Sequence, residues 1–220
     1  MGLLEIAASE IGALIAFLAR GWALHTDWVE ITGFLTGVAN VWLLARQNIW
    51  NWPVALANNG LYLAVFISAG LYGDAGLQLV YAAFGVYGWW SWLRPASDAK
   101  ALGVQRFSWA RARQVVAATL CGFVLLALFL WRFTDSTVPV ADGLTTALAL
   151  AATWGQSRKY VESWWLWIAA DLIYIPLYAY KRLWLTSVLY VVFLALCVGG
   201  LRAWQRQWRE VNSQDPRGWV

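Results

Sequence analysis

With 220 residues, the chain is 61% hydrophobic and only 13% charged, and its formal net charge is +4. A soluble domain of this length needs far more polar residues to cover its surface, so the composition indicates an integral membrane protein. The only histidine is His25, and both cysteines lie inside apolar stretches, which argues against a metal site, a disulfide or a cofactor. The positive charge lies in loops and in the C-terminal tail, so it bears on membrane orientation and not on nucleic acid.

An all-α fold is predicted, with seven transmembrane helices after a short N-terminal helix. Residues 3–19 are apolar but contain Glu5 and Glu10, so we expect this first helix to lie at the membrane interface. A tight turn is predicted at Leu71–Gly76, between the second and third spans. The seven spans are predicted at Ile31–Ala45, Val54–Ala69, Leu77–Trp92, Val115–Trp131, Gly143–Gln156, Trp164–Tyr180 and Trp184–Ala203.

An internal repeat relates the first three spans to the last three, without a gap and at one constant offset in residue number. This offset matches Arg46 with Arg158 and Trp52 with Trp164. A single linking helix between two three-span repeats gives both repeats the same orientation, so we expect a parallel 3+1+3 arrangement. Repeats of this kind place a substrate site near the midplane, between the two halves.

Five segments follow from this division of the chain. They are an N-terminal interfacial helix and loop, a first three-helix bundle, a basic loop with the linker helix, a second three-helix bundle and a cytoplasmic tail. Their predicted bounds are 1–30, 31–93, 94–133, 134–205 and 206–220.

Basic residues are concentrated on one side of the predicted topology. The loops after the first, third and fifth spans and the C-terminal tail share one side and hold most of the arginine and lysine residues. The opposite side holds Arg132, Lys181 and Arg182. Basic loops stay in the cytoplasm, so we expect a multi-pass protein of the cell inner membrane with its N-terminus outside and its C-terminus inside.

The predicted sixth span carries a single acid, Asp171, near its middle. Trp164, Trp167, Asp171, Tyr174 and Tyr178 are spaced by three, four, three and four residues, so they share one helical face. An ionised side chain at this depth costs about 2.5–3.5 kcal/mol and usually faces a bundle interior or a water-filled cavity. Aromatic rings beside a carboxylate suit a flat cationic ligand. The alternative is that Asp171 only ties two helices together by a hydrogen bond.

The repeat predicts which residues of the first half lie opposite this face of the sixth span. At the same offset, Asn59 corresponds to Asp171 and Gln78 corresponds to Tyr190. We therefore expect Asn59 and Asp171 at matching depth on the central helices, with Gln78 and Tyr190 on the third helices. A polar cavity lined by aromatic rings is typical of a small-molecule site.

Other classes of function fit the sequence less well. An integral-membrane enzyme needs a nucleophile and base or metal ligands at membrane depth, and the sequence offers no such group. A structural or receptor subunit explains the small-residue contacts, but not the polar and aromatic stripe on both central helices. A proton-coupled carrier that uses Asp171 stays open, because burial favours the protonated form of a carboxyl group.

One motif resembles a known family. The pattern Trp164-x-x-Trp167-x-x-x-Asp171 is similar to the W-x-x-W-x-x-x-N/D signature of the Pnu vitamin transporters, which include the PnuC nicotinamide riboside transporters. The similarity extends over about residues 28–205 and includes Trp52-Pro53 and the run Tyr87-Gly88-Trp89.

The resemblance implies a homotrimer of protomers related in fold to the SWEET sugar transporters, each with its own pathway. It implies facilitated diffusion of a vitamin that is trapped by phosphorylation inside the cell, and it assigns Trp164, Trp167 and Asp171 to the binding site. Nicotinamide riboside is the expected substrate, since Asn59 and Gln78 suit ribose hydroxyls. Thiamine is the alternative, then riboflavin or a deoxyribonucleoside, because the family position of Asp171 is Asn in some riboside carriers.

Overall fold

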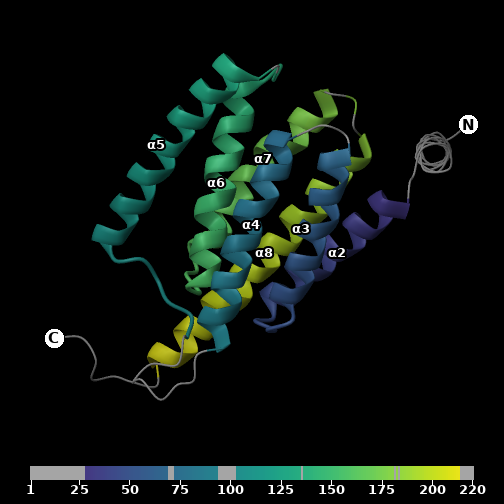
Figure 1. Ribbon diagram of the computed structural model, residues 1–220. Coiled ribbons are helices and arrows are strands. Elements are labelled where there is room, and N and C mark those ends of the chain that lie inside the picture. The colour runs from purple at the N-terminus through teal and green to yellow at the C-terminus, as the bar shows by residue number, and fades with distance from the viewer. Residues whose placement is uncertain are drawn as a thin grey trace, which may run out of the picture.

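The computed structural model describes residues 28–68, 72–93, 103–134, 136–180, 182 and 184–213. These residues form seven α-helices, which confirms the predicted all-α fold (Figure 1). The predicted helix at 3–19 lies outside the described residues. The helices are α2 (Trp28–Ala45), α3 (Asn51–Ser68), α4 (Tyr72–Leu93), α5 (Trp109–Phe133), α6 (Pro139–Ser157), α7 (Ser163–Tyr180) and α8 (Trp184–Ser213).

Three helices are markedly longer than the sequence predicted. Helix α4 begins at Tyr72, so most of the predicted turn at Leu71–Gly76 is helical. Its glycines disfavour a helix by about 1 kcal/mol each, but burial of Ala75 holds this turn in place. Helix α5 begins at Trp109, where the Ser108 side chain accepts a hydrogen bond from the Arg111 amide at 3.3 Å. Helix α8 continues to Ser213 because its last turns are rich in good helix formers.

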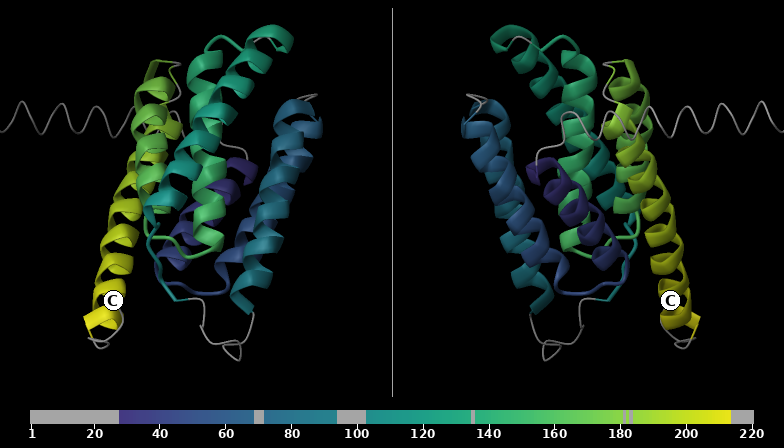
Figure 2. Two further views of the ribbon diagram at one scale, coloured as in Figure 1. Left: turned by 90° about the vertical axis from the view of Figure 1, so that its left-hand side faces the viewer. Right: turned by 90° about the vertical axis from the view of Figure 1, so that its right-hand side faces the viewer.

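The helices alternate in direction along the chain, so that α2, α4, α6 and α8 run one way and α3, α5 and α7 run the other (Figures 1 and 2). Helix α2 packs against α8, and α4 packs against α6. Helix α5 lies along α6 at the edge of the bundle and has no buried residue. At their contact, a Cβ added to Gly143 would lie 2.7 Å from the backbone nitrogen of Ala127, so only glycine allows this approach.

The turn between α2 and α3 has the same backbone structure as the turn between α6 and α7. Gln47 and Lys159, which are equivalent positions of the repeat, both have positive φ angles, of 52° and 56°. The Gln47 amide donates to the Leu44 carbonyl at 2.9 Å, and the Lys159 amide donates to the Gln156 carbonyl at 3.0 Å. Helices α3 and α7 also begin and end at equivalent positions of the repeat.

A pair of tryptophan rings recurs at the same offset. Trp52 of α3 meets Trp92 of α4 edge-on, with ring centroids 5.4 Å apart and an interplanar angle of 89°. Trp164 of α7 meets Trp204 of α8 with the same distance and angle. Equivalent positions of the two sequence halves therefore make equivalent contacts between helices.

Two helices in the described part of the chain are long and apolar enough to cross a membrane, judged by length and composition. They are α5, at Trp109–Phe133, and the Thr186–Ser213 portion of α8; the apolar part of α2, at Ile31–Ala45, is shorter. Large apolar side chains are exposed along α5, among them Leu125, which is 63% exposed. Such a face suits contact with lipid.

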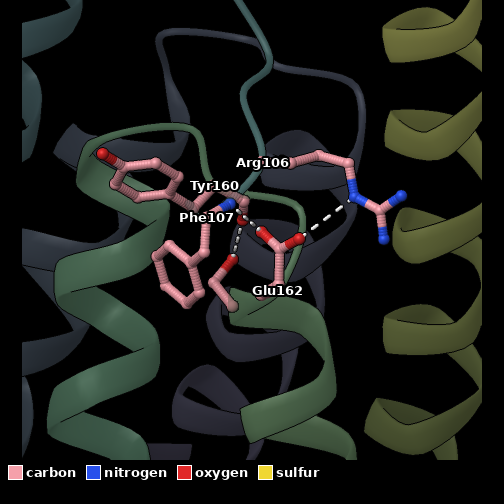
Figure 3. A network of polar contacts seen from close by, with 5 residues as sticks. Arg106, Phe107, Tyr160 and Glu162 are labelled. Atoms are coloured by element: carbon pink, nitrogen blue, oxygen red, sulfur yellow. Dashed lines mark hydrogen bonds and ion pairs between the residues drawn. The ribbon is translucent and has the colours of Figure 1, made fainter. Parts of the chain in front are cut away.

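Hydrogen bonds and a ring contact hold the segment that leads into α5 against the turn between α6 and α7 (Figure 3). The Glu162 carboxylate accepts from Arg106 Nε at 3.1 Å and from the Phe107 amide at 3.0 Å. The Phe107 ring packs on Tyr160 with centroids 4.6 Å apart. The same turn reaches α4 through Lys159, whose ammonium lies 4.5 Å from the Trp92 ring centroid; burial lowers the pKa of this lysine.

We expect Glu162→Ala to loosen this attachment without unfolding the helices. The change removes the partner of Arg106 and the acceptor of the Phe107 amide, and a partly exposed hydrogen bond contributes only about 0.5–1.5 kcal/mol. Hydrogen exchange at the Phe107 amide should therefore become about two- to tenfold faster. Glu210→Ala, which truncates an exposed glutamate on α8, should leave that amide unchanged. Unaltered exchange in the Glu162 variant would show that other contacts hold the segment.

Candidate functional site

Asp171 lies in the middle of α7 and is only 1% exposed. The Cys197 thiol of α8 lies within hydrogen-bonding range of its carboxyl group. Its Oδ2 atom has no hydrogen-bond partner among the described residues. Leaving a buried acceptor unpaired costs about 1–3 kcal/mol, and more when the group is charged. A carboxylate placed at such a cost marks a functional site more often than a structural one.

Three tyrosine rings pack together close to this carboxylate. The ring centroids of Tyr174 and Tyr190 lie 4.5 Å apart, those of Tyr178 and Tyr190 lie 5.2 Å apart, and those of Tyr174 and Tyr178 lie 5.5 Å apart. Tyr190 also interacts electrostatically with Asp171. Four of the predicted site residues, from two helices, therefore form one cluster.

Neighbouring helices enclose this cluster on several sides. The Tyr174 side chain lies within hydrogen-bonding range of Thr145 of α6 and within electrostatic range of Tyr81 of α4. On the other side, Phe193 meets Tyr190 edge-on and reaches α2. A Cβ added to Gly37 of α2 would lie 3.2 Å from the end of the Phe193 ring. The aromatic cluster is thus central to the bundle and touches both sequence halves.

The two tryptophans of the motif lie apart from the tyrosines, in a hydrophobic core between α2, α7 and α8. Trp164 is fully buried: its ring packs on Trp204 and fills the space over Gly200. Trp167 is partly buried and packs against the same core. In this conformation the Trp164 ring is enclosed by protein on all sides, so it fixes α7 against α8.

The predicted amides of the first half are partly buried, and no hydrogen bond among the described residues joins either of them to the tyrosine cluster. Asn59 lies on α3, and Gln78 lies on α4, one turn before Tyr81. Asn58 is the amide that ties helices together. Its Nδ2 atom donates to Thr36 Oγ1 at 2.7 Å and to the Gly33 carbonyl at 3.1 Å, both on α2.

Sequence reasoning did not single out two side chains inside the bundle. Cys197, one of the two cysteines of the apolar stretches, is buried, and its thiol lies within hydrogen-bonding range of the Asp171 carboxyl group. Asn40 of α2 has a buried side-chain oxygen without a partner among the described residues. The sequence does carry a signal for Asn40, because it is a polar residue inside an apolar span, one turn after Gly37.

A surface hollow of about 580 Å³ lies elsewhere, between α4 and α6. It is lined by apolar and aromatic side chains and includes none of the predicted site residues; they are Leu79, Val80, Ala83, Phe84, Tyr87 and Trp154. A binding site needs a few convergent polar groups as well as apolar walls. We therefore place the candidate site at Asp171, which is closed off from solvent in this conformation.

The chain is similar to known transporters over most of its length. It is 32% identical to the riboflavin/roseoflavin transporter RibM of Streptomyces davaonensis, over 82% of this chain and 85% of that protein. It is 24% identical to the nicotinamide riboside transporter PnuC of Escherichia coli, over 86% and 89% of the two chains. For PnuC of Neisseria mucosa the identity is 27%, over 86% of this chain and 76% of the relative.

The fold is shared with a solved structure. The crystal structure of the vitamin B3 transporter PnuC superposes with a TM-score of 0.68 at 23% identity, over 95% of this chain and 94% of that chain. The family model for nicotinamide mononucleotide transporters matches residues 27–206, which cover all seven described helices except the end of α8. The chain therefore belongs to this PnuC family of membrane transporters.

Proposed function

We propose that this transporter takes up nicotinamide riboside by facilitated diffusion, and that phosphorylation inside the cell traps the vitamin. The observation that supports the proposal is the buried Asp171 carboxylate, with one oxygen unpaired, beside three packed tyrosine rings. Nicotinamide riboside combines a flat, permanently positive ring with ribose hydroxyls. It thus offers the charge and the hydrogen-bond donors that this carboxylate lacks.

The energetics favour a cationic solute over a neutral one. A positive ring replaces the missing partner of Asp171 and offsets the cost of its burial. Each cation–π contact with an aromatic face adds about 0.5–2 kcal/mol. Tyr174, Tyr178 and Tyr190 present such rings next to the carboxylate. A neutral heterocycle gains the stacking but leaves the charge without a counter-ion.

The remaining predicted site residues complete the proposed pathway from both halves. Asn59 and Gln78 would bond ribose hydroxyls from α3 and α4. Trp164 and Trp167 would border the solute two turns and one turn before Asp171, respectively. Because Asp171 and Trp164 are closed off in this conformation, the solute enters only after helices separate. This requirement fits a carrier that alternates between closed and open states.

We further propose that the seven helices form the parallel 3+1+3 arrangement of the SWEET-related transporters, with α5 as the linker. The matching turns at Gln47 and Lys159 support this arrangement, as do the matching tryptophan pairs. The contacts of α2 with α8 and of α4 with α6 are also equivalent under the repeat. Such an arrangement places Asp171 between the halves.

The proposed setting is the cell inner membrane, with the N-terminus outside and the C-terminus inside. Helices α2, α4 and α6 end at the same side of the bundle as α8 (Figure 1). The turns on that side contain Arg46, Arg158 and Lys159, as the positive-inside rule requires of a cytoplasmic face. A homotrimer is proposed on the family resemblance, and its exposed α5 faces would meet lipid or neighbouring protomers.

Riboflavin is a second candidate, because the relative with 32% identity is a riboflavin/roseoflavin transporter. Its larger, uncharged ring system could stack on the tyrosine cluster, and its ribityl hydroxyls could donate to Asp171. The two candidates differ in how they would interact with the carboxylate. The riboside would bind it as a counter-ion, whereas riboflavin would use only an acceptor oxygen.

Uptake by purified protein in liposomes distinguishes these candidates. We expect radiolabelled nicotinamide riboside to equilibrate across the membrane, and unlabelled riboside to compete better than thiamine or riboflavin. Uptake of riboflavin without uptake of the riboside would reverse the assignment. Accumulation above the external concentration when a proton gradient is imposed would replace facilitated diffusion by proton coupling.

A further inference from the structure

The packing of α2 on α8 fixes which residues of these helices lie at the same depth. Gly37 faces the Phe193 ring, and two turns further the Ala45 carbonyl accepts from Trp204 Nε1 at 3.2 Å. The two helices therefore run in the same direction. This alignment brings Asn40, one turn after Gly37, to the level of the turn of α8 that follows Phe193.

That turn of α8 contains Cys197, whose thiol lies within hydrogen-bonding range of Asp171. Asn40 from α2 and Asp171 from α7 thus approach the same turn of α8 from two sides. Each has a buried acceptor oxygen without a partner among the described residues, Oδ1 of Asn40 and Oδ2 of Asp171. Buried acceptors are normally satisfied, so a molecule that brings donors would complete the hydrogen bonding of both oxygens.

We propose that Asn40 is a substrate-contacting residue that shares one polyhydroxylated vitamin with Asp171. This inference rests on the proposed transport function and assigns a separate part of the solute to each of the two residues. Asp171 takes the charged or hydrogen-bonding end of the ring system, and Asn40 accepts from a hydroxyl of the ribosyl or ribityl group. Because Asn40 belongs to the first sequence half and Asp171 to the second, the solute bridges the halves and favours the closed state.

Asn58 provides a matched control on the neighbouring helix. It is also an asparagine inside an apolar span, but its amide is bonded to Thr36 and Gly33 of α2. Its truncation should lower the melting temperature, because it leaves the Gly33 carbonyl and the Thr36 hydroxyl without their donor. Asn40→Leu, by contrast, removes an unpaired acceptor and keeps the number and branching of the side-chain heavy atoms, so the melting temperature should stay the same or rise.

The test measures binding of two probes to the purified full-length protein by calorimetry. One probe is nicotinamide riboside, and the other is 1-methylnicotinamide, which keeps the cationic ring but has no ribose. We expect Asn40→Leu to weaken riboside binding about three- to tenfold, the effect of one lost hydrogen bond, and to leave 1-methylnicotinamide binding unchanged. Equal affinity of wild type and variant for the riboside would overturn the inference.

Two further outcomes are also decisive. A marked loss of melting temperature in Asn40→Leu, as large as that of Asn58→Ala, would assign Asn40 to helix packing and reject the inference. If the wild type binds riboflavin but not the riboside, the proposed substrate fails, and the inference is tested on riboflavin against lumichrome, which lacks the ribityl chain. Weaker binding of riboflavin by the Asn40→Leu variant, with unchanged binding of lumichrome, would then support the role of Asn40.

Discussion

Replacing Asp171 by asparagine is expected to weaken binding of a cationic vitamin far more than binding of an uncharged analogue of the same shape. Asparagine keeps the size and one acceptor oxygen but removes the charge from a side chain that is 1% exposed. A buried charge-assisted contact contributes about 1.5–3 kcal/mol, which corresponds to a loss of about ten- to hundredfold in affinity. Calorimetry with nicotinamide riboside and with its uncharged dihydropyridine form measures this difference directly.

Two controls accompany this experiment. Glu162→Gln removes a negative charge at the turn between α6 and α7, outside the tyrosine cluster, and should leave both affinities unchanged. In the absence of vitamin, Asp171→Asn should raise the melting temperature, because an unpaired buried charge is replaced by a neutral amide. Equal losses for the cationic and the uncharged probe would remove the counter-ion role of Asp171.

Gly200→Ala is expected to be the most damaging single change to the packing of α7 on α8. A Cβ at this position would lie 2.5 Å from the Trp164 ring, and that ring is fully buried against Trp204. The indole has no space into which to move, so helices must shift apart. Overpacking of this kind typically costs about 1–3 kcal/mol, and a thermal unfolding assay in detergent should show a melting temperature lower by several degrees.

The adjacent glycine is a matched control. No atom lies within 4 Å of a Cβ added to Gly199, so Gly199→Ala should be neutral or slightly stabilising through its helix propensity. The repeat predicts that Gly88→Ala also lowers the melting temperature, because a Cβ at this position would lie 2.2 Å from the Trp52 ring. Equal melting temperatures for the alanine variants at positions 199 and 200 would contradict the view that Trp164 is a fixed packing element.

Much of the candidate site followed from helical spacing alone. Residues three and four apart share a face of a helix, so Asp171, Tyr174 and Tyr178 had to point the same way once α7 was recognised. The internal repeat paired Gln78 with a position on α8 and so led to Tyr190. The structure places Asp171 and the three tyrosines in one cluster.

The same reasoning could not show how tightly each residue of one face is packed. Trp164 and Asp171 are two turns apart on one face, and the sequence predicted both as substrate-binding residues. The structure encloses Trp164 in helix packing, because Gly200 leaves a space that the indole fills. Cys197 was missed because its relation to Asp171 depends on the contact between α7 and α8, which the spacing within one helix does not specify.

The sequence by itself determined the membrane class, the seven helices, the repeat and the acid at the centre of α7. These properties depend on composition and on periodicity within one helix, which are local. Only the tertiary structure decided how closely α8 approaches both α2 and α7, and that Oδ1 of Asn40 and Oδ2 of Asp171 are buried without a partner among the described residues. The close approach occurs at Gly37 and Gly200, and no local pattern specifies how two distant helices align.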